Sequence, residues 1–206
     1  MKVEIYSHAA VSELIAGGFP EKTAVISFYT PRGTRRAEDL RVDYSAVCDR
    51  VFYIAVPDID LKCLGDYGYT YESYIEDTAG LSRFVYDALR DGWDLICQCD
   101  FGQSRSAACA AAVLEHLEGR GIDIFADYRY YPNQLVYHKV HDALEEHLER
   151  LVTDAIKASP DGASADAIQR KCGLGFGRAR SAIDKLLLAG AITAQNGKYL
   201  LKSDEM

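Results

Sequence analysis

Cys99 and Arg105 lie six positions apart and have the residue types needed for attack on a phosphate group. A thiolate attacks well and leaves well, so hydrolysis can proceed in two easier steps. A planar guanidinium fits two phosphate oxygens, and consecutive backbone N–H groups at a helix N-terminus attract an anion. The same donors favour the thiolate form of the cysteine. We therefore predict a phosphate site with Cys99 as nucleophile and a binding loop formed by Asp100, Phe101, Gly102, Gln103, Ser104 and Arg105.

The sequence around this loop predicts that it joins a strand to a helix. Residues 94–98 are an apolar run typical of a buried strand, and residues 105–118 are an apolar run that favours a helix. Gly102 lies in mid-loop, where the chain can need a backbone conformation closed to other residues. The same spacing recurs at Cys172 and Arg178, but a polar helical run precedes that cysteine. Because this spacing also arises by chance, the residues around each match must decide, and they favour Cys99 and Arg105.

The run Gln98-Cys99-Asp100-Phe101-Gly102-Gln103-Ser104-Arg105-Ser106 resembles the signature His-Cys-x-x-Gly-x-x-Arg-Ser/Thr of cysteine-dependent protein tyrosine and dual-specificity phosphatases. Within that class it most resembles the small bacterial and phage members. The mid-chain position of the motif argues against low-molecular-weight phosphatases and arsenate reductases, which carry it near the N-terminus. Gln98 replaces the usual histidine; it carries no charge but can still hydrogen-bond the loop. The resemblance implies a phosphatase fold and a cysteinyl-phosphate intermediate.

The resemblance also implies an aspartic acid that protonates the leaving oxygen from a separate loop. Asp58 and Asp60 follow the strand predicted at residues 50–56, in a segment similar to Phe-Asp-Asp-x-Asp of small bacterial relatives. Asp66 lies further on, at a separation from the cysteine closer to that of eukaryotic dual-specificity enzymes. We favour Asp58, then Asp60, then Asp66, and each is equally consistent with a turn acid at a strand end.

Several neighbouring polar residues have two interpretations each. Ser106 is expected to donate a hydrogen bond to the sulfur and ease its departure, or to satisfy the helix terminus. Cys97 and Cys109 are expected to be small buried residues, or else one of them traps the oxidised nucleophile as a disulfide. His138 and His141 have no third ligand at a suitable spacing, so no metal and no cofactor is expected.

Strands and helices alternate along the first part of the chain. Strands are expected at residues 3–6, 23–29, 50–56 and 94–98, and helices at 9–16, 77–91 and 105–118. This alternation predicts an α/β fold, with a central, largely parallel sheet flanked by helices. The proposed phosphate loop then lies at the carboxyl edge of the sheet, where such folds bind ligands.

Two other loops have competing interpretations. Residues 31–39 contain three arginines, which predict either a solvated face or a flank that attracts anionic substrate. The Tyr-Pro-Asn run at residues 131–133 is similar to segments of small bacterial relatives, which favours a loop near the pocket. The alternative is a packed connection in which Asn133 caps the next helix.

Composition limits the class of protein. The chain has 206 residues, six cysteines and a formal net charge of −8. No apolar run approaches the roughly 20 residues that span a bilayer, and the N-terminus lacks the apolar core of a signal peptide. Several free cysteines, one of them reactive, favour a reducing compartment. We expect a cytoplasmic protein with no membrane partner, and the sequence does not indicate its oligomeric state.

A change in composition near residue 150 predicts two domains, a cysteine-dependent phosphatase domain at 1–150 and a winged-helix domain at 151–206. The second part reads as three helices followed by a hairpin at Asn196-Gly197, a strong two-residue turn. Residues 174–190 resemble the DNA-reading winged helix of bacterial chromosome-segregation translocases. This resemblance implies candidate DNA contacts at Arg178, Arg180, Lys185 and Lys198. A protein-interaction or dimerisation module is the alternative, since the positive charge of this part is small.

Two functions agree with these patterns. The first is a phosphomonoester hydrolase, with a phosphorylated protein or a small phosphomonoester as substrate. The second is a phosphate-binding regulatory protein with little turnover, associated with DNA through the winged helix. The sequence does not identify the substrate, because every phosphomonoester presents the same dianion.

Overall fold

The computed structural model describes residues 1–31, 41–173 and 175–202 of the chain. The expectation about Arg32, Arg35 and Arg36 therefore lies outside the described residues. The chain divides into two compact units, Met1–Leu144 and Glu145–Met206. Each is described by itself below.

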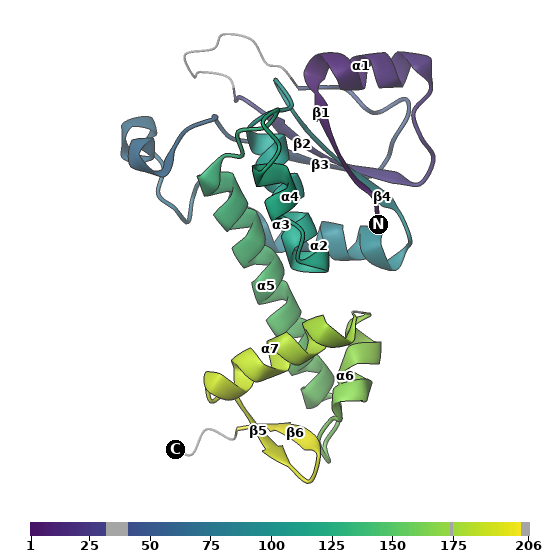
Figure 1. Ribbon diagram of the computed structural model, residues 1–206, viewed down its shortest axis with the longest axis vertical. Coiled ribbons are helices and arrows are strands. Elements are labelled where there is room, and N and C mark those ends of the chain that lie inside the picture. Colours follow the sequence, from purple (N-terminus) through teal and green to yellow (C-terminus); the bar gives the residue numbers. More distant parts are fainter. Residues whose placement is uncertain (32–40, 174, 203–206) are drawn as a thin grey trace. The chain divides into compact units, whose positions relative to one another are not determined.

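The helices and strands follow one another in a clear order in the described residues (Figure 1). The first unit contains β1 (Val3–Ser7), α1 (His8–Gly17), β2 (Thr23–Tyr29), β3 (Val51–Ala55), the short 3-10 helices η1 (Leu61–Cys63) and η2 (Gly65–Tyr67), α2 (Thr78–Arg90), β4 (Asp94–Cys99), α3 (Arg105–Glu118) and α4 (Ile122–Phe125). Helix α5 (Gln134–Lys157) crosses the boundary, and α6 (Ala165–Cys172), α7 (Phe176–Leu188), β5 (Ile192–Gln195) and β6 (Lys198–Leu201) complete the second unit.

The predicted α/β class and the parallel central sheet are confirmed. In the described residues of the first unit, four strands lie in the order β1-β4-β2-β3, and all three pairings are parallel. On one face, Val11 of α1 packs with Val25, Ile96 and Tyr44 in a buried cluster. On the other face, the ring of Phe52 lies 5.6 Å from that of Phe84 in α2. Helices therefore cover both faces, as alternating strands and helices require.

Small side chains bring α3 close to the sheet. This helix follows the central strand β4 and buries five alanines completely: Ala107, Ala108, Ala110, Ala111 and Ala112. Alanine has high helix propensity and adds almost no width, so the helix keeps its geometry while its backbone approaches the strands. The strand-to-helix connection at residues 100–104 is held between these two buried elements.

The second unit ends in a two-stranded hairpin. Strands β5 and β6 pair antiparallel, and the predicted turn at Asn196 and Gly197 is confirmed, with φ of 51° and 74°. Two positive φ angles in a two-residue loop match the twist of the flanking strands. Ser164 caps α6 by accepting a hydrogen bond from the backbone N–H of Ala167.

None of the helices in the described residues is both long and apolar enough to cross a membrane.

Candidate active site

Cys99 is the last residue of β4, and its side chain is buried under the loop that follows. The residue is 1% exposed, and its Sγ lies 3.0 Å from the Oγ of Ser106 in the first turn of α3. The hydroxyl is therefore within hydrogen-bond reach of the sulfur, the arrangement expected for a group that stabilises a departing thiolate.

Several backbone N–H groups of the loop have no hydrogen-bond acceptor among the described residues. In the described part of the chain, no protein acceptor takes the backbone N–H of Gly102, Gln103, Ser104 or Arg105. Ser104 is the N-cap of α3, yet its side chain makes no capping hydrogen bond. Four consecutive unfilled donors at the start of a 14-residue helix are suited to an anion.

Arg105 is held rigidly by two hydrogen bonds, and several of its N–H donors are not used by them. Its side chain is 1% exposed; Nη1 donates to the carbonyl oxygen of Val56 at 2.7 Å, and Nη2 donates to Oδ2 of Asp100 at 2.7 Å. Within the described residues, Nε has no hydrogen-bond acceptor. Asp100 takes only one of the two Nη2 hydrogens, so the fork of Nε and Nη2 predicted to bind phosphate is still available.

Asp58 lies at the mouth of the same loop. Its Oδ1 accepts hydrogen bonds from Ser104 Oγ and from Asn133 Nδ2, both at 2.8 Å. Its Oδ2 is 3.8 Å from Nε of Arg105, and the side chain is one third exposed. The preferred candidate acid is thus brought to the loop from a separate segment after β3.

The two other candidate acids are not brought to the loop by any hydrogen bond in the described residues. Asp60 precedes η1 and Asp66 lies within η2, and both are exposed. Their positions agree with the alternative interpretation of acids in turns.

The Tyr-Pro-Asn segment has both of the roles that were left open. Asn133 Oδ1 accepts from the N–H of Val136 and so caps α5, while Nδ2 donates to Asp58 and to the carbonyl of Ile59. The N–H of Tyr131 donates to the carbonyl of Gln103 at 2.9 Å. One segment therefore fixes both the loop and the candidate acid.

Gly102 has a conformation and a neighbour that exclude a side chain. Its φ is +71°, and a Cβ at this position would lie 2.6 Å from the backbone nitrogen of Ser7 at the end of β1. The loop therefore rests directly on the neighbouring strand. Phe101 and Gln103 on either side are exposed, whereas Asp100 is buried.

Sequence reasoning missed the role of Asp100. It was expected to contribute only its backbone, but its carboxylate pairs with Arg105 and accepts from Thr30 Oγ1 at 3.3 Å. The only available signal was an acidic residue between the cysteine and the arginine. Val56 was missed as well, because a carbonyl group carries no sequence signature.

Gln98 does not bond to the loop in the described structure. Its Oε1 accepts from Ser27 Oγ at 2.7 Å and from the hydroxyl of Tyr44 at 3.3 Å. Successive side chains of a strand point to opposite faces, so Gln98 faces away from the side that holds the neighbouring thiol. The expected hydrogen bond from Gln98 to the loop, in place of the one from the usual histidine, is therefore absent from the described residues.

The neighbouring cysteines are buried, as expected. Cys97 and Cys109 are completely inaccessible. The pKa of the Cys97 thiol is raised well above its usual value. The largest cause is a hydrogen bond with Cys109, and the second is burial. In the described ranges, no group of three or more metal-ligating side chains comes together.

The candidate DNA contacts of the second unit lie in ion pairs or on the surface. Arg178 pairs with Glu145 at 3.2 Å, and Lys185 pairs with the same carboxylate. Arg180 pairs with Asp184 one turn along α7 at 3.1 Å. The fourth candidate, Lys198, begins β6 and is exposed.

No family model and no curated protein matches this chain. Solved structures similar to it include PTPMT1 in complex with PI(5)P, at 12% identity and a TM-score of 0.45, covering 72% of this chain and 94% of that chain. Another is human DUSP28, at 15% identity and a TM-score of 0.42, with the same coverage of both chains. A second structure of PTPMT1 has 14% identity and a TM-score of 0.38, covering 72% and 93%. These likenesses are weak and show no function, so the function of the chain is inferred from the residues of the site.

Proposed function

We propose that the chain is a phosphomonoester hydrolase of the protein tyrosine and dual-specificity type. The proposal rests on one observation: the buried Cys99 ends a strand, and the loop that follows it carries four amides without a protein acceptor and a fixed arginine. A phosphate dianion in this loop receives hydrogen bonds from the amides and from Nε of Arg105.

In the first step, Cys99 Sγ forms a bond to phosphorus while the bond from phosphorus to the ester oxygen breaks. The proton of the Asp58 carboxylic acid passes to that oxygen, and a neutral alcohol or phenol departs. The loop amides and Arg105 hold the charge of the transferred phosphoryl oxygens. Asp60 is the alternative donor, but of these two acids Asp58 is the one with a hydrogen bond to the loop among the described residues.

In the second step, a water oxygen attacks phosphorus and the bond from phosphorus to sulfur breaks. The Asp58 carboxylate takes one proton from the water and returns to its acid form. Ser106 donates a hydrogen bond to the departing thiolate, as its 3.0 Å distance from Sγ allows. Neither step needs a cofactor.

The test is the hydrolysis of p-nitrophenyl phosphate by the full chain. We expect turnover by the wild type and its complete loss in Cys99→Ser. Cys48→Ser is the matched control, because Cys48 hydrogen-bonds the carbonyls of Thr23 and Arg50, at the end of β2 away from the loop. Phosphate that binds without any turnover by the wild type would identify the regulatory alternative instead.

We further propose that the second unit is a winged-helix module. The end of α5, the helices α6 and α7 with a glycine-containing turn between them, and the terminal hairpin follow the predicted order of three helices and a wing, which supports this assignment. This order of elements does not distinguish DNA from protein as the partner of the module, because a fold does not determine a function.

A further inference from the structure

Strand β3 forms an edge of the central sheet, and half of its backbone groups point outward. The N–H of Val25 donates to Arg50, and that of Val56 donates to Tyr29, so the even-numbered residues face β2. Alternation along a strand then turns the N–H and C=O groups of Val51, Tyr53 and Ala55 to the open side. In the described part of the chain, none of these groups has a hydrogen-bond partner.

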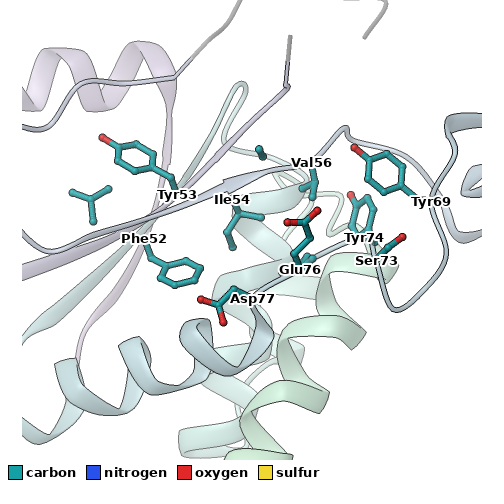
Figure 2. Close-up of a pocket in the computed structure, with 12 residues that line it drawn as sticks. Phe52, Tyr53, Ile54, Val56, Tyr69, Ser73, Tyr74, Glu76 and Asp77 are labelled. Carbon is teal, nitrogen blue, oxygen red and sulfur yellow. The ribbon is translucent and has the colours of Figure 1, made fainter. Parts of the chain in front are cut away.

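A cavity of about 430 Å³ lies beside this edge (Figure 2). One wall is β3 with the residue that follows it, 51–56, and the other is formed by Tyr69 and residues 73–77. Figure 2 shows the phenol rings of Tyr69 and Tyr74 near Val56, and Glu76 and Asp77 opposite Ile54 and Phe52 of β3. We call this cavity and the outer edge of β3 the β3 groove.

The second wall of the groove is fixed before any ligand binds. Tyr74 is 1% exposed, and its hydroxyl donates to the carbonyl of Pro57 at 2.6 Å. The ring of Tyr69 packs edge-on against that of Tyr74, with centroids 5.7 Å apart. A preformed groove lowers the ordering cost of binding, which otherwise consumes much of the affinity.

The second wall of the groove carries two acidic side chains, while Arg41 stacks on the ring of Tyr53 on the β3 side, 3.9 Å from its centroid. Glu76 and Asp77 are exposed on its wall, and its described lining contains no lysine or arginine. Asp77 accepts a hydrogen bond from the N–H of Gly80, while Glu76 is in no ion pair in the described residues. The groove thus offers unpaired backbone groups, apolar side chains and a free carboxylate.

We propose that the β3 groove binds an extended segment of another protein, which adds as a strand to the sheet and places a lysine or arginine at Glu76. Main-chain hydrogen bonds to Val51, Tyr53 and Ala55 supply affinity, and the carboxylate selects the basic side chain. A second copy of this chain is a poorer occupant, because pairing two β3 edges brings like charges together. The proposal is independent of the proposed hydrolase activity.

The test uses isotope-labelled full-length protein and a synthetic peptide, acetyl-Thr-Val-Lys-Val-Lys-Val-Thr-amide. We expect the amide signals of Val51, Tyr53 and Ala55 to shift at about 1 mM peptide, the range in which weak peptides bind. The same peptide with N-methyl groups on alternate residues keeps its side chains but loses the backbone N–H donors along one side of the extended chain. We expect its binding to be lost.

Charge selection is tested with Glu76→Lys, for which we expect about fivefold weaker binding. Glu13→Lys is the matched control, because Glu13 is exposed on α1, away from the groove. Three results would overturn the proposal: no shift at the β3 amides, equal binding of the N-methylated peptide, or shifts that depend only on protein concentration. The last would identify a second copy as the occupant.

Discussion

At the scale of single residues, Arg105 is the best-defined element of the site. A buried guanidinium needs partners, and Asp100 and the carbonyl of Val56 supply them. These two contacts fix the plane of the group and leave Nε without an acceptor in the described residues. The orientation of the phosphate ligand is therefore set before the ligand arrives, which lowers the cost of binding it.

The role of Asp58 predicts a dependence on the leaving group. Asp58→Asn keeps the hydrogen-bonding shape but removes the transferable proton, so phenyl phosphate hydrolysis should fall by about 10²–10⁴-fold. p-Nitrophenolate leaves without much help, so its hydrolysis should fall less. Steady-state kcat for both esters measures the difference.

Asp60→Asn is the matched control, and it should leave both rates nearly unchanged. If Asp60→Asn shows the larger loss on phenyl phosphate, the acid has been assigned to the wrong residue. Equal losses on the two esters by Asp58→Asn would indicate a role in positioning Ser104 rather than in proton transfer.

The side chains proposed to react could be selected from the sequence, whereas most of the contacts that hold them could not. Cys99, Arg105 and Asp58 have side chains whose chemistry limits the alternatives, and local spacing narrows them further. Thr30 reaches the site through a contact between segments far apart in the chain. For Asn133, the resemblance to relatives indicated a place near the pocket but not the hydrogen bond to Asp58. A single sequence has no signal for such long-range pairing.

At the scale of elements, the loop depends on the strand beneath it. Gly102→Ala places a methyl group against the backbone of Ser7 and forces an alanine to a φ of +71°. The backbone strain alone costs about 1–3 kcal/mol, and the overlap adds to it. We expect a lower free energy of unfolding and weaker inhibition by inorganic phosphate, measured by urea denaturation and by competition.

Gly92→Ala separates the two effects. Its φ is +69°, but a Cβ there meets nothing within 4 Å. It should lose stability through strain alone and keep its affinity for phosphate. Equal affinity for phosphate in both variants would show that the loop does not rest on β1 as described.

The order of the elements was predictable, but their packing partners were only partly so. Apolar periodicity located β2, β4 and α3, because each is buried and regular. The 3-10 turns η1 and η2 were not predicted, since each is only three residues long and lies in a polar segment. The unfilled edge of β3 is also a property of the assembled sheet rather than of the strand.

At the scale of the whole molecule, the net negative charge of the chain opposes binding to DNA, which is also negative. The net charge is −8, and Arg178, Arg180 and Lys185 already have carboxylate partners. Phosphates must compete with those partners, so binding to duplex DNA should occur only at low salt.

If α7 contacts DNA, Arg180→Ala reduces the slope of log affinity against log salt by about 1. Arg150→Ala is the control on α5, and it should leave the slope unchanged. Fluorescence anisotropy of a labelled duplex measures both. No binding by the wild type at about 50 mM salt would reject the DNA prediction.

The proposed hydrolase activity requires that Cys99 lies beneath an anion site completed by the loop amides and Arg105. A crystal structure of the full chain with orthovanadate tests it most directly. We expect vanadium bonded to Sγ of Cys99, with its oxygens hydrogen-bonded by the amides of residues 102–105 and by Nε of Arg105. Vanadate bound elsewhere, or an empty loop at saturating vanadate, would contradict the account.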